Sequence, residues 1–291
     1  MKTELFLWRG DTYQIDSIIK SSSGISYEVE ERLGRGGNGV VHKCTNQSTG
    51  DEYAIKFLLK YDKSDKRRRR FDHECEKLKD LDHPHIVRHI VSGRTPSKRN
   101  NQGRKSNKPV DYLIMDYADG GDLKGFLATN PLIEPEIYKA QFRGLADALR
   151  HIHGQGLLHR DIKPENVIII AGRWVLSDFG LCAPLNRAGR DLTGDENLGP
   201  RFWMSPEMIN RSLGIKTHYS KIDKPSDVFQ LASVFWFAVN RRHPTGALVS
   251  SDWGGEISLC EVARRALDYC PKRRIQNGED FYAELLSAIE G

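Results

Sequence analysis

The sequence predicts a mixed α+β protein whose first half is rich in strands and whose second half is rich in helices. Short segments with partly alternating apolar residues, bounded by turn residues, fill the first half. Longer segments with apolar residues three or four positions apart fill the second half. Because a strand-rich segment followed by a helix-rich one forms separate packed layers, we expect two lobes with a cleft between them.

Four strands are predicted before the first helix. Residues 13–19 and 25–33 alternate partly and are separated by a Ser-Ser-Ser-Gly turn. Residues 40–44 and 52–59 follow, and the polar residues between them predict a hairpin loop.

A helix, two short strands and a basic segment complete the first half. Apolar side chains recur at helical spacing in residues 66–81, which predicts a helix. Residues 86–91 and 112–115 are short strand candidates. Residues 92–109 are polar, rich in Lys and Arg and free of acidic residues, so we expect an exposed loop there.

Four helices are predicted in the second half. Residues 134–153 carry apolar side chains at spacings of three or four, and Gly154 ends the pattern. Residues 227–240 are apolar nearly all round, which predicts a buried helix. Residues 257–269 and 279–289 are the remaining two.

Composition excludes several classes of protein. The 291 residues are 38% apolar and 29% charged, as in ordinary globular proteins. No apolar run approaches the ~20 residues of a membrane helix, and no secretory signal is visible. The five scattered cysteines disfavour a disulfide framework and a zinc site. We therefore expect a cytoplasmic protein without a membrane span.

Basic residues are clustered although the net charge is only +5. The clusters lie at 60–70 and 94–108. Binding to nucleic acid is one interpretation. We favour a solvated helix face and a surface loop, and no nucleic-acid partner, because neither cluster contains the aromatic platform that stacks on bases.

A glycine-rich segment at 34–39 is the first candidate for binding chemistry. Its sequence, Gly-Arg-Gly-Gly-Asn-Gly, lets backbone amides approach phosphate oxygens closely. The pattern also occurs in dinucleotide-binding folds, where it opens a helix. Here the following residues 40–44 continue as a strand, so we expect a strand–loop–strand cover over phosphate groups.

Lys56 is the second candidate, because it ends an otherwise apolar strand, Tyr53-Ala54-Ile55-Lys56. A lysine at such a position is either a snorkelling surface residue or a buried cation with a carboxylate partner. Glu74 lies on the predicted helix that follows. We favour Glu74 over Glu76 as the partner, because Glu76 points about 200° away around the helix.

The third signal is the most specific. His159-Arg160-Asp161-Ile162-Lys163-Pro164-Glu165-Asn166 is followed by Ser177-Asp178-Phe179-Gly180. With these motifs the sequence resembles the eukaryotic-type protein kinase family, over about residues 27–274. The resemblance implies a two-lobed protein-kinase-like fold with ATP in the cleft.

The resemblance also implies a role for each matched residue. Asp161 would accept or orient the proton of the substrate hydroxyl, and Lys163 would neutralise the transferred phosphoryl group. Asn166 and Asp178 would hold the metal ion. Lys56, paired with Glu74, would contact the ATP phosphates.

Nucleotide-binding positions follow from the same resemblance. The glycine loop would cover the phosphates, an apolar roof would cover adenine, and residues 112–123 would form the hinge. The implied residues are Leu33, Gly34, Gly36, Gly39, Val41, Ala54, Met115, Asp116 and Ala118.

The family pattern also implies boundaries and structural pairs. We expect an N-terminal extension at 1–26, which adds an edge strand to the small lobe. An N-lobe at 27–115 with the basic loop 92–109, a hinge at 116–121 and a C-lobe at 122–291 would follow. Met204-Ser205-Pro206-Glu207 resembles the family's Ala-Pro-Glu turn, where Glu207 would pair with Arg274. Asp227 would brace the backbone of the catalytic loop.

Substrate class follows from two positions that point in different directions. Lys163 is the family's serine/threonine signature. Pro200 stands where serine/threonine members usually carry threonine, and proline there is closer to tyrosine-kinase usage. We expect a serine/threonine kinase, and dual specificity remains an alternative.

A regulatory pair is expected in the loop after the Asp-Phe-Gly motif. Arg160 is the arginine that pairs with a phosphorylated activation loop in the family, and Thr193 is the candidate hydroxyl. The alternative is that Asp191, Asp195 or Glu196 supplies the negative charge constitutively.

One departure from the family lies after the buried helix. Only twenty-seven residues join His243 to Pro271, fewer than the family usually has. The helix that often docks substrates or regulators is therefore expected to be short or missing.

Two other classes compete with the protein kinase interpretation. Small-molecule kinases lack the Ala-Pro-Glu-like turn with its arginine partner, and both are present. A pseudokinase scaffold would lack a catalytic position, and none is missing. We expect a kinase that uses ATP with Mg²⁺, or alternatively Mn²⁺, and that also autophosphorylates. Its expected partners are protein substrates and a separate sensor or regulatory protein.

Overall fold

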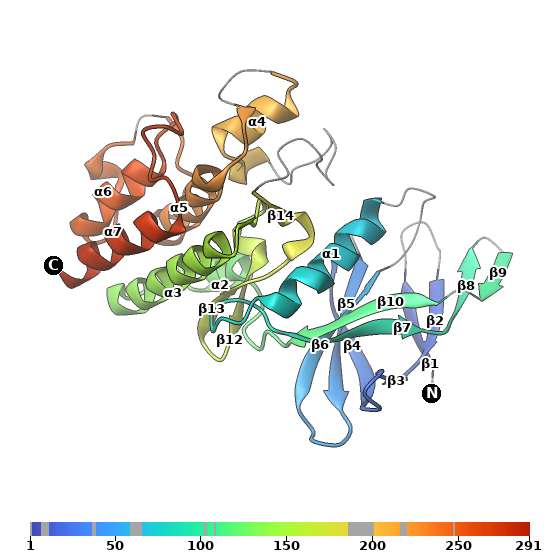
Figure 1. Cartoon of the computed structure of the whole chain (residues 1–291). Helices are drawn as coiled ribbons and strands as arrows, with labels where there is room; N and C mark the ends of the chain where they lie inside the picture. Colours follow the sequence, from blue (N-terminus) through green and yellow to red (C-terminus); the bar gives the residue numbers. More distant parts are fainter. Residues whose placement is uncertain are drawn as a thin grey trace. The chain divides into compact units, whose positions relative to one another are not determined.

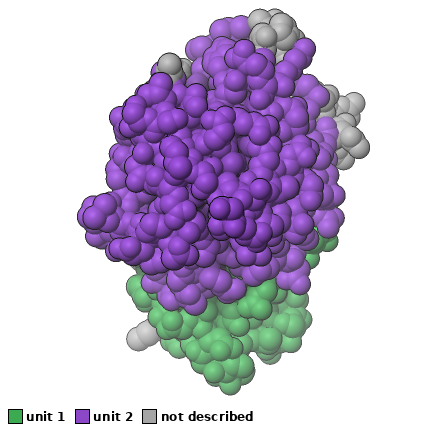
Figure 2. All heavy atoms as spheres, turned by 90° about the vertical axis from the view of Figure 1, so that its left-hand side faces the viewer, with its two compact units in different colours: residues 1–80, 88–117 green, residues 81–87, 118–291 purple. Residues whose placement is uncertain are grey.

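The structure is a computed structural model. It describes residues 2–6, 12–36, 39–58, 66–101, 104–107, 109–185, 201–215, 220–246 and 248–291. The chain divides into two compact units, one of residues 1–80 and 88–117 and one of residues 81–87 and 118–291 (Figure 2). The first unit is rich in strands and the second in helices, so the chain has the mixed α+β architecture that the sequence predicted.

A six-stranded antiparallel sheet forms the centre of the first unit, in the order β3-β4-β5-β6-β10-β7 (Figure 1). Side chains along β5 alternate between buried and partly exposed, as expected for a sheet with one face on a core. Among the described residues of this unit, one helix, α1, is present. The elements are β3 (Ile18–Lys20), β4 (Ser26–Gly36), β5 (Gly39–Asn46), β6 (Glu52–Leu58), α1 (Lys66–Asp80), β7 (His89–Thr95) and β10 (Val110–Asp116).

A second sheet of four strands lies in the same unit. Its order is β1 (Lys2–Phe6), β2 (Thr12–Asp16), β8 (Ser97–Asn101) and β9 (Arg104–Asn107). The prediction of a loop at 92–109 was therefore wrong, because this segment contains the end of β7 and the pair β8–β9. The polar residues form strands because β2 supplies a pairing partner, with Thr12 opposite Asn100 and Ile15 opposite Ser97.

The N-terminal residues contribute to both sheets. β3 is an edge strand of the six-stranded sheet, whereas β1 and β2 belong to the four-stranded one. Tyr13 and Ile15 on β2 are buried and join the same apolar cluster as Ile19, Tyr27 and Val29. One core thus holds the two sheets together.

Six helices form most of the second unit within the described residues. They are α2 (Leu123–Thr129), α3 (Pro135–Gly154), α4 (Pro206–Ser212), α5 (Lys224–Asn240), α6 (Ile257–Ala266) and α7 (Gly278–Glu290). Two short antiparallel strand pairs accompany them: β11 (Leu157–Leu158) with β14 (Ala183–Pro184), and β12 (Val167–Ile170) with β13 (Arg173–Leu176).

Helix α5 lies at the centre of this unit and is buried on nearly all sides. Its Phe235 ring stacks on Phe142 of α3 at a centroid distance of 4.0 Å and lies 5.8 Å from Phe281 of α7. α7 can approach α3 closely because residue 278 is glycine. A Cβ there would lie 2.7 Å from the backbone nitrogen of Arg150.

Residues 241–256 connect α5 to α6. Among the described residues of this connection the only helical segment is the 3-10 helix Ser250–Asp252. No helix in the described parts of the chain is long and apolar enough to cross a membrane.

Candidate active site

The segment that carries Asp161 is anchored by Asp227 on α5. The Asp227 carboxylate is fully buried and accepts hydrogen bonds from the backbone amides of His159, at 2.7 Å, and Arg160, at 2.8 Å. His153 Nε2 lies 3.1 Å from the same carboxylate. Burial acts to raise the pKa of Asp227, but the contacts with His153 and the Arg160 amide prevail and lower it. A carboxylate held charged in this way fixes the backbone at His159 and Arg160. The φ of Arg160 is +69°.

Asp161 forms a tight cluster with a cation and an amide. Its Oδ2 lies 2.6 Å from Lys163 Nζ and accepts a hydrogen bond of 2.9 Å from Asn166 Nδ2. Asn166 Nδ2 also donates to the Asp161 backbone carbonyl, at 2.8 Å. Burial raises the pKa of Asp161 to about 6, although Lys163 opposes the shift. This carboxylate is therefore a stronger base than an exposed one and is still ionised at neutral pH.

Asn166 and Asp178 present the oxygen atoms that a hard cation prefers. The amide nitrogen of Asn166 is engaged by Asp161, which leaves its side-chain oxygen to act as the ligand atom. Asp178 has a left-handed backbone with φ +59° and ψ +70°, an unusual conformation for a residue with a Cβ. Magnesium commonly takes only one or two protein ligands and fills the rest with water and phosphate oxygens, so this donor set fits it.

Contacts at Ser177 and Phe179 hold the catalytic loop to the segment that contains Asp178. The Ser177 backbone amide donates to the Asn166 carbonyl at 2.8 Å. His159 Nε2 lies 3.2 Å from the Ser177 carbonyl, and the His159 ring lies 4.7 Å from that of Phe179. Because His159 Nδ1 accepts from the Asp161 amide, Nε2 is the ring nitrogen that donates to the Ser177 carbonyl. Burial lowers the pKa of His159.

Lys56 and Glu74 meet inside the first unit. Lys56 Nζ lies 2.8 Å from both carboxylate oxygens of Glu74, and both side chains are buried. Glu76 is exposed and contacts Lys77 instead. The sequence favoured a helix register in which Glu74, and not Glu76, faces Lys56. Helix α1 has this register.

Four of the predicted nucleotide-contact residues share one face of the six-stranded sheet. Ala54 and Lys56 are two residues apart on β6, so their side chains point the same way. Met115 lies opposite Ala54 on β10, and Val41 lies opposite Lys56 on β5. The sheet therefore carries an apolar strip that ends at a buried lysine.

The glycine-rich segment joins β4 to β5. Gly34 and Gly36 end β4, and Gly39 begins β5, while residues 37 and 38 lie outside the described residues. A Cβ at Gly39 would collide with the Phe57 carbonyl, so this glycine is also required by packing within the sheet. Leu33 is exposed on β4.

The hinge candidates fall on both units. Asp116 ends β10, and its carboxylate accepts hydrogen bonds from the backbone amide and the guanidinium of Arg88, so it is tied within the first unit. Ala118 begins the second unit.

The Ala-Pro-Glu-like turn is buried against the end of the chain. Glu207 and Arg274 form an ion pair of 2.7 Å with almost no exposed surface. Ser226 donates to the same carboxylate at 2.6 Å, next to the start of α5. Thr193 and Pro200 lie outside the described residues, and Arg160 is buried.

Sequence reasoning missed two polar residues that organise this site. His153 bridges Asp227 and the backbone amide of Gly278, at 3.1 and 2.9 Å. Gln230 accepts from the Ile162 amide and donates to the Trp203 carbonyl, so it joins the catalytic loop to the segment before α4. The available signal was a polar side chain on the buried face of an otherwise apolar helix.

Comparison with known proteins gives a consistent result. Residues 27–280 match the protein kinase domain family. The serine/threonine-protein kinase cds1 of Schizosaccharomyces pombe is 30% identical over 236 residues, covering 78% of this chain and 47% of the relative. The maternal embryonic leucine zipper kinase of Danio rerio is 34% identical over 63% of this chain and 25% of its own length. The probable serine/threonine-protein kinase MARK-C of Dictyostelium discoideum is 32% identical over 60% and 23%. The chain thus matches half or less of the length of each relative.

Proposed function

The chain belongs to the protein kinase family, and on this premise we propose that it transfers the γ-phosphoryl group of ATP to serine and threonine hydroxyls of proteins. A protein kinase domain uses ATP with a divalent metal ion. We assign Mg²⁺ to this chain, with Mn²⁺ as the alternative, because Asn166 and Asp178 supply oxygen ligands. Bound there, the metal would neutralise charge on the phosphate oxygens.

Asp161 is the proposed proton acceptor for the substrate hydroxyl. Its pKa of about 6 keeps it ionised at neutral pH, while its burial makes it more basic than a surface carboxylate. Lys163, 2.6 Å from the Asp161 carboxylate, carries the positive charge that offsets the charge on the transferring group. This Asp161–Lys163–Asn166 cluster is the observation that carries the proposal.

Lys56 is the proposed cation for the nucleotide phosphates, oriented by Glu74. Leu33, Val41, Ala54 and Met115 would enclose the adenine, and the backbone of Asp116 and Ala118 would bond its edge. Lys163 supports serine and threonine as acceptors, and two of the relatives are themselves named serine/threonine-protein kinases.

Transfer of labelled phosphate to a generic protein substrate tests the function directly. We expect transfer with ATP and Mg²⁺ and a loss of about 100- to 10,000-fold in Asp161→Asn, the range for a lost general base. Phosphoamino-acid analysis of the product checks the acceptor: phosphotyrosine would establish dual specificity. Absence of any metal-dependent transfer by the intact chain would favour a scaffold function.

Regulation by Thr193 is a second part of the proposal. A phosphate on Thr193 would bring about −1.5 to −2 charges toward Arg160. Autophosphorylation predicts that mass spectrometry finds this site modified in the intact chain and unmodified in Asp161→Asn. Unchanged specific activity of Thr193→Ala would instead assign the charge to Asp191, Asp195 or Glu196.

A further inference from the structure

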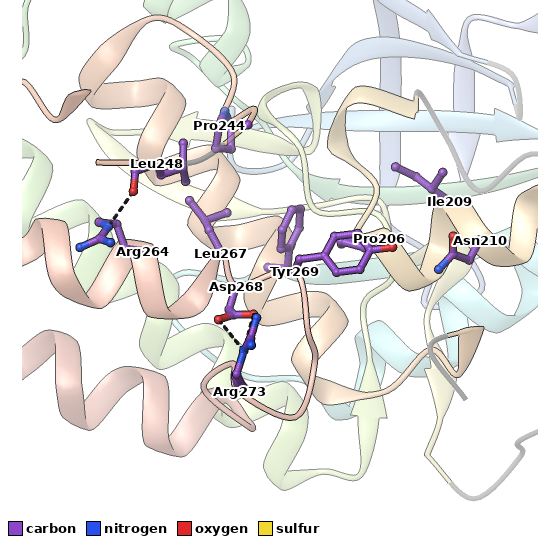
Figure 3. Close-up of a pocket in the computed structure, with 12 residues that line it drawn as sticks. Pro206, Ile209, Asn210, Pro244, Leu248, Arg264, Leu267, Asp268, Tyr269 and Arg273 are labelled. Atoms are coloured by element: carbon purple, nitrogen blue, oxygen red, sulfur yellow. Dashed lines mark hydrogen bonds and ion pairs between the residues drawn. The ribbon is translucent and has the colours of Figure 1, made fainter. Parts of the chain in front are cut away.

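A pocket of about 490 Å³ opens in the second unit, and none of the predicted catalytic residues lines it (Figure 3). Its walls come from α4, α5, the end of α6 and the two segments that follow α5 and α6. Pro206 and Ile209 of α4 and Phe229 of α5 form one wall. Leu248, Leu267 and Tyr269 form the other.

The connection between α5 and α6 supplies part of the pocket lining. Pro244, Gly246 and Leu248 of this connection line the pocket. Arg264 holds the connection there, since its Nε donates to the Leu248 carbonyl at 3.0 Å (Figure 3). The one helical segment among the described residues of this connection, the 3-10 helix Ser250–Asp252, does not line the pocket.

The apolar surface extends beyond the pocket. Tyr269 is 63% exposed and lines it. Leu213, 54% exposed, lies four residues after Ile209 and therefore on the same side of α4. Large apolar side chains exposed together around a concavity are typical of binding sites, because water is a poor partner for them.

Polar groups at the rim suit a peptide with negative charge. Asn210 lines the pocket, and its carboxamide can pair with a peptide backbone. Four of the five basic side chains in residues 257–274 are paired with carboxylates: Arg264 with Glu261, Arg265 with Glu284, Arg273 with Asp268 and Arg274 with Glu207. Arg273 pairs with Asp268 at 3.1 Å but its side chain stays 71% exposed, and Lys272 beside it is exposed too.

We propose that this pocket docks an extended segment of a protein partner, with one bulky apolar side chain in the pocket and an acidic residue beside it. The apolar side chain would lie between Pro206, Phe229 and Tyr269. The acidic residue would face Arg273 and Lys272, whose exposed positive groups match it.

The docked segment would also reach the catalytic framework. Arg274 Nε donates to the Asp268 carbonyl at 3.0 Å, and its guanidinium lies 4.9 Å from the Phe229 ring, so it backs the pocket. The same guanidinium holds Glu207 at the start of α4. Because Arg274 contacts both the pocket and Glu207, docking is expected to stabilise the position of α4, which comes after the segment Arg201–Trp203.

Fluorescence anisotropy with defined peptides tests the proposal on the full chain. The probes share a Gly-Ser-X-Glu-Glu-Ser-Gly frame, with Phe, Leu, Trp or Ala at X, and a second set replaces both Glu residues with Lys. We expect Ala at X, or Lys for Glu, to weaken binding about tenfold, the loss of one buried side chain or one charge contact. Equal binding of the acidic and basic frames, or no binding of either, overturns the proposal.

Variants locate the binding. Tyr269→Ala and Arg273→Ala alter exposed side chains and are expected to weaken binding of the Phe peptide about tenfold without lowering the Tm. Leu132→Ala is the matched control, because Leu132 is an exposed apolar residue, at 89%, that does not line the pocket. Undiminished binding by both pocket variants overturns the proposal.

Two further measurements separate the remaining outcomes. Asp161→Asn is expected to bind the peptides as well as the parent chain, so a failure of docking is distinguishable from a failure of catalysis. Sedimentation over a range of concentrations checks the chain itself as an occupant. Self-association that is lost in Tyr269→Ala would assign the pocket to a second copy and overturn docking of a different protein.

Discussion

The catalytic cluster of the second unit and the Lys56–Glu74 pair of the first are held in different ways. Asp161 lies on a segment that Asp227, Gln230 and Ser177 all bond, and Asp227 itself has three partners. Glu74 depends on the position of one helix, α1, which begins with Lys66-Arg67-Arg68-Arg69-Arg70. Positive charge is unfavourable at a helix N-terminus. The catalytic loop is thus held by several partners within its own unit, whereas the Lys56–Glu74 pair depends on one helix that begins with unfavourable charge.

Removing the anchor of the catalytic loop is the strongest test of this difference. Asp227→Ala leaves the amides of His159 and Arg160 and the ring of His153 buried without their acceptor, so we expect a loss of about 3–5 kcal/mol in unfolding free energy. Urea denaturation followed by tryptophan fluorescence measures it. A loss below about 1 kcal/mol would contradict the anchoring of the catalytic loop by Asp227.

Breaking the Lys56–Glu74 pair of the first unit is expected to affect catalysis more than it affects the fold of the second unit. Glu74→Gln keeps the shape but removes the charge that orients Lys56, and a misplacement of that cation costs about 100-fold in kcat/KM. Hydrogen exchange is expected to leave the protection of α5 unchanged. Glu76→Gln is the matched control and should retain activity, because Glu76 lies two residues further along the same helix and is exposed.

The pH dependence of transfer sharpens the description of Asp161. Its pKa of about 6 predicts that kcat/KM falls tenfold per pH unit below about pH 6, as the carboxylate takes up a proton. Because Lys163 lowers this pKa, Lys163→Met is expected to move the inflection to higher pH. The group's raised pKa also means that protonation favours the folded state, so its contribution to stability decreases as pH rises from about 4 to about 6. An inflection unmoved by Lys163→Met would assign it to another group.

The smallest expected effect comes from the charge at the start of α1. Arg69→Glu places a negative charge in the first turn and should stabilise the helix by about 0.3–1 kcal/mol. Exchange protection of α1, measured by mass spectrometry, is expected to rise by about two- to fivefold. Lys79→Glu, in the last turn of the same helix, should have the opposite sign.

Much of the site was predictable because its chemistry is local in sequence. Helical periodicity was enough to choose Glu74, and contiguous motifs carried Asp161 and Asn166. The start of α5 was placed three residues late, because its N-cap, Asp223, with Ser226 in a capping box, precedes the apolar run.

What was missed depends on contacts between distant segments. His153 and Gln230 acquire their roles only when α3 and α5 pack together, and helix α4 is too short for a periodic signal. The strands β8 and β9 have no apolar alternation at all. β8 forms because β2 pairs with it, and β9 pairs in turn with β8, and no local pattern reports such partners.

The four-stranded sheet also sets an order of events during synthesis. β1 and β2 precede β8 in the chain, but β2 pairs with β8, in which Asn100 is opposite Thr12. The ribosome must therefore add more than eighty residues after β2 before this sheet can form. Until then Tyr13 and Ile15, destined for the core, stay without their final neighbours. A pause in translation before residue 100 would prolong the exposure of these two side chains to chaperones.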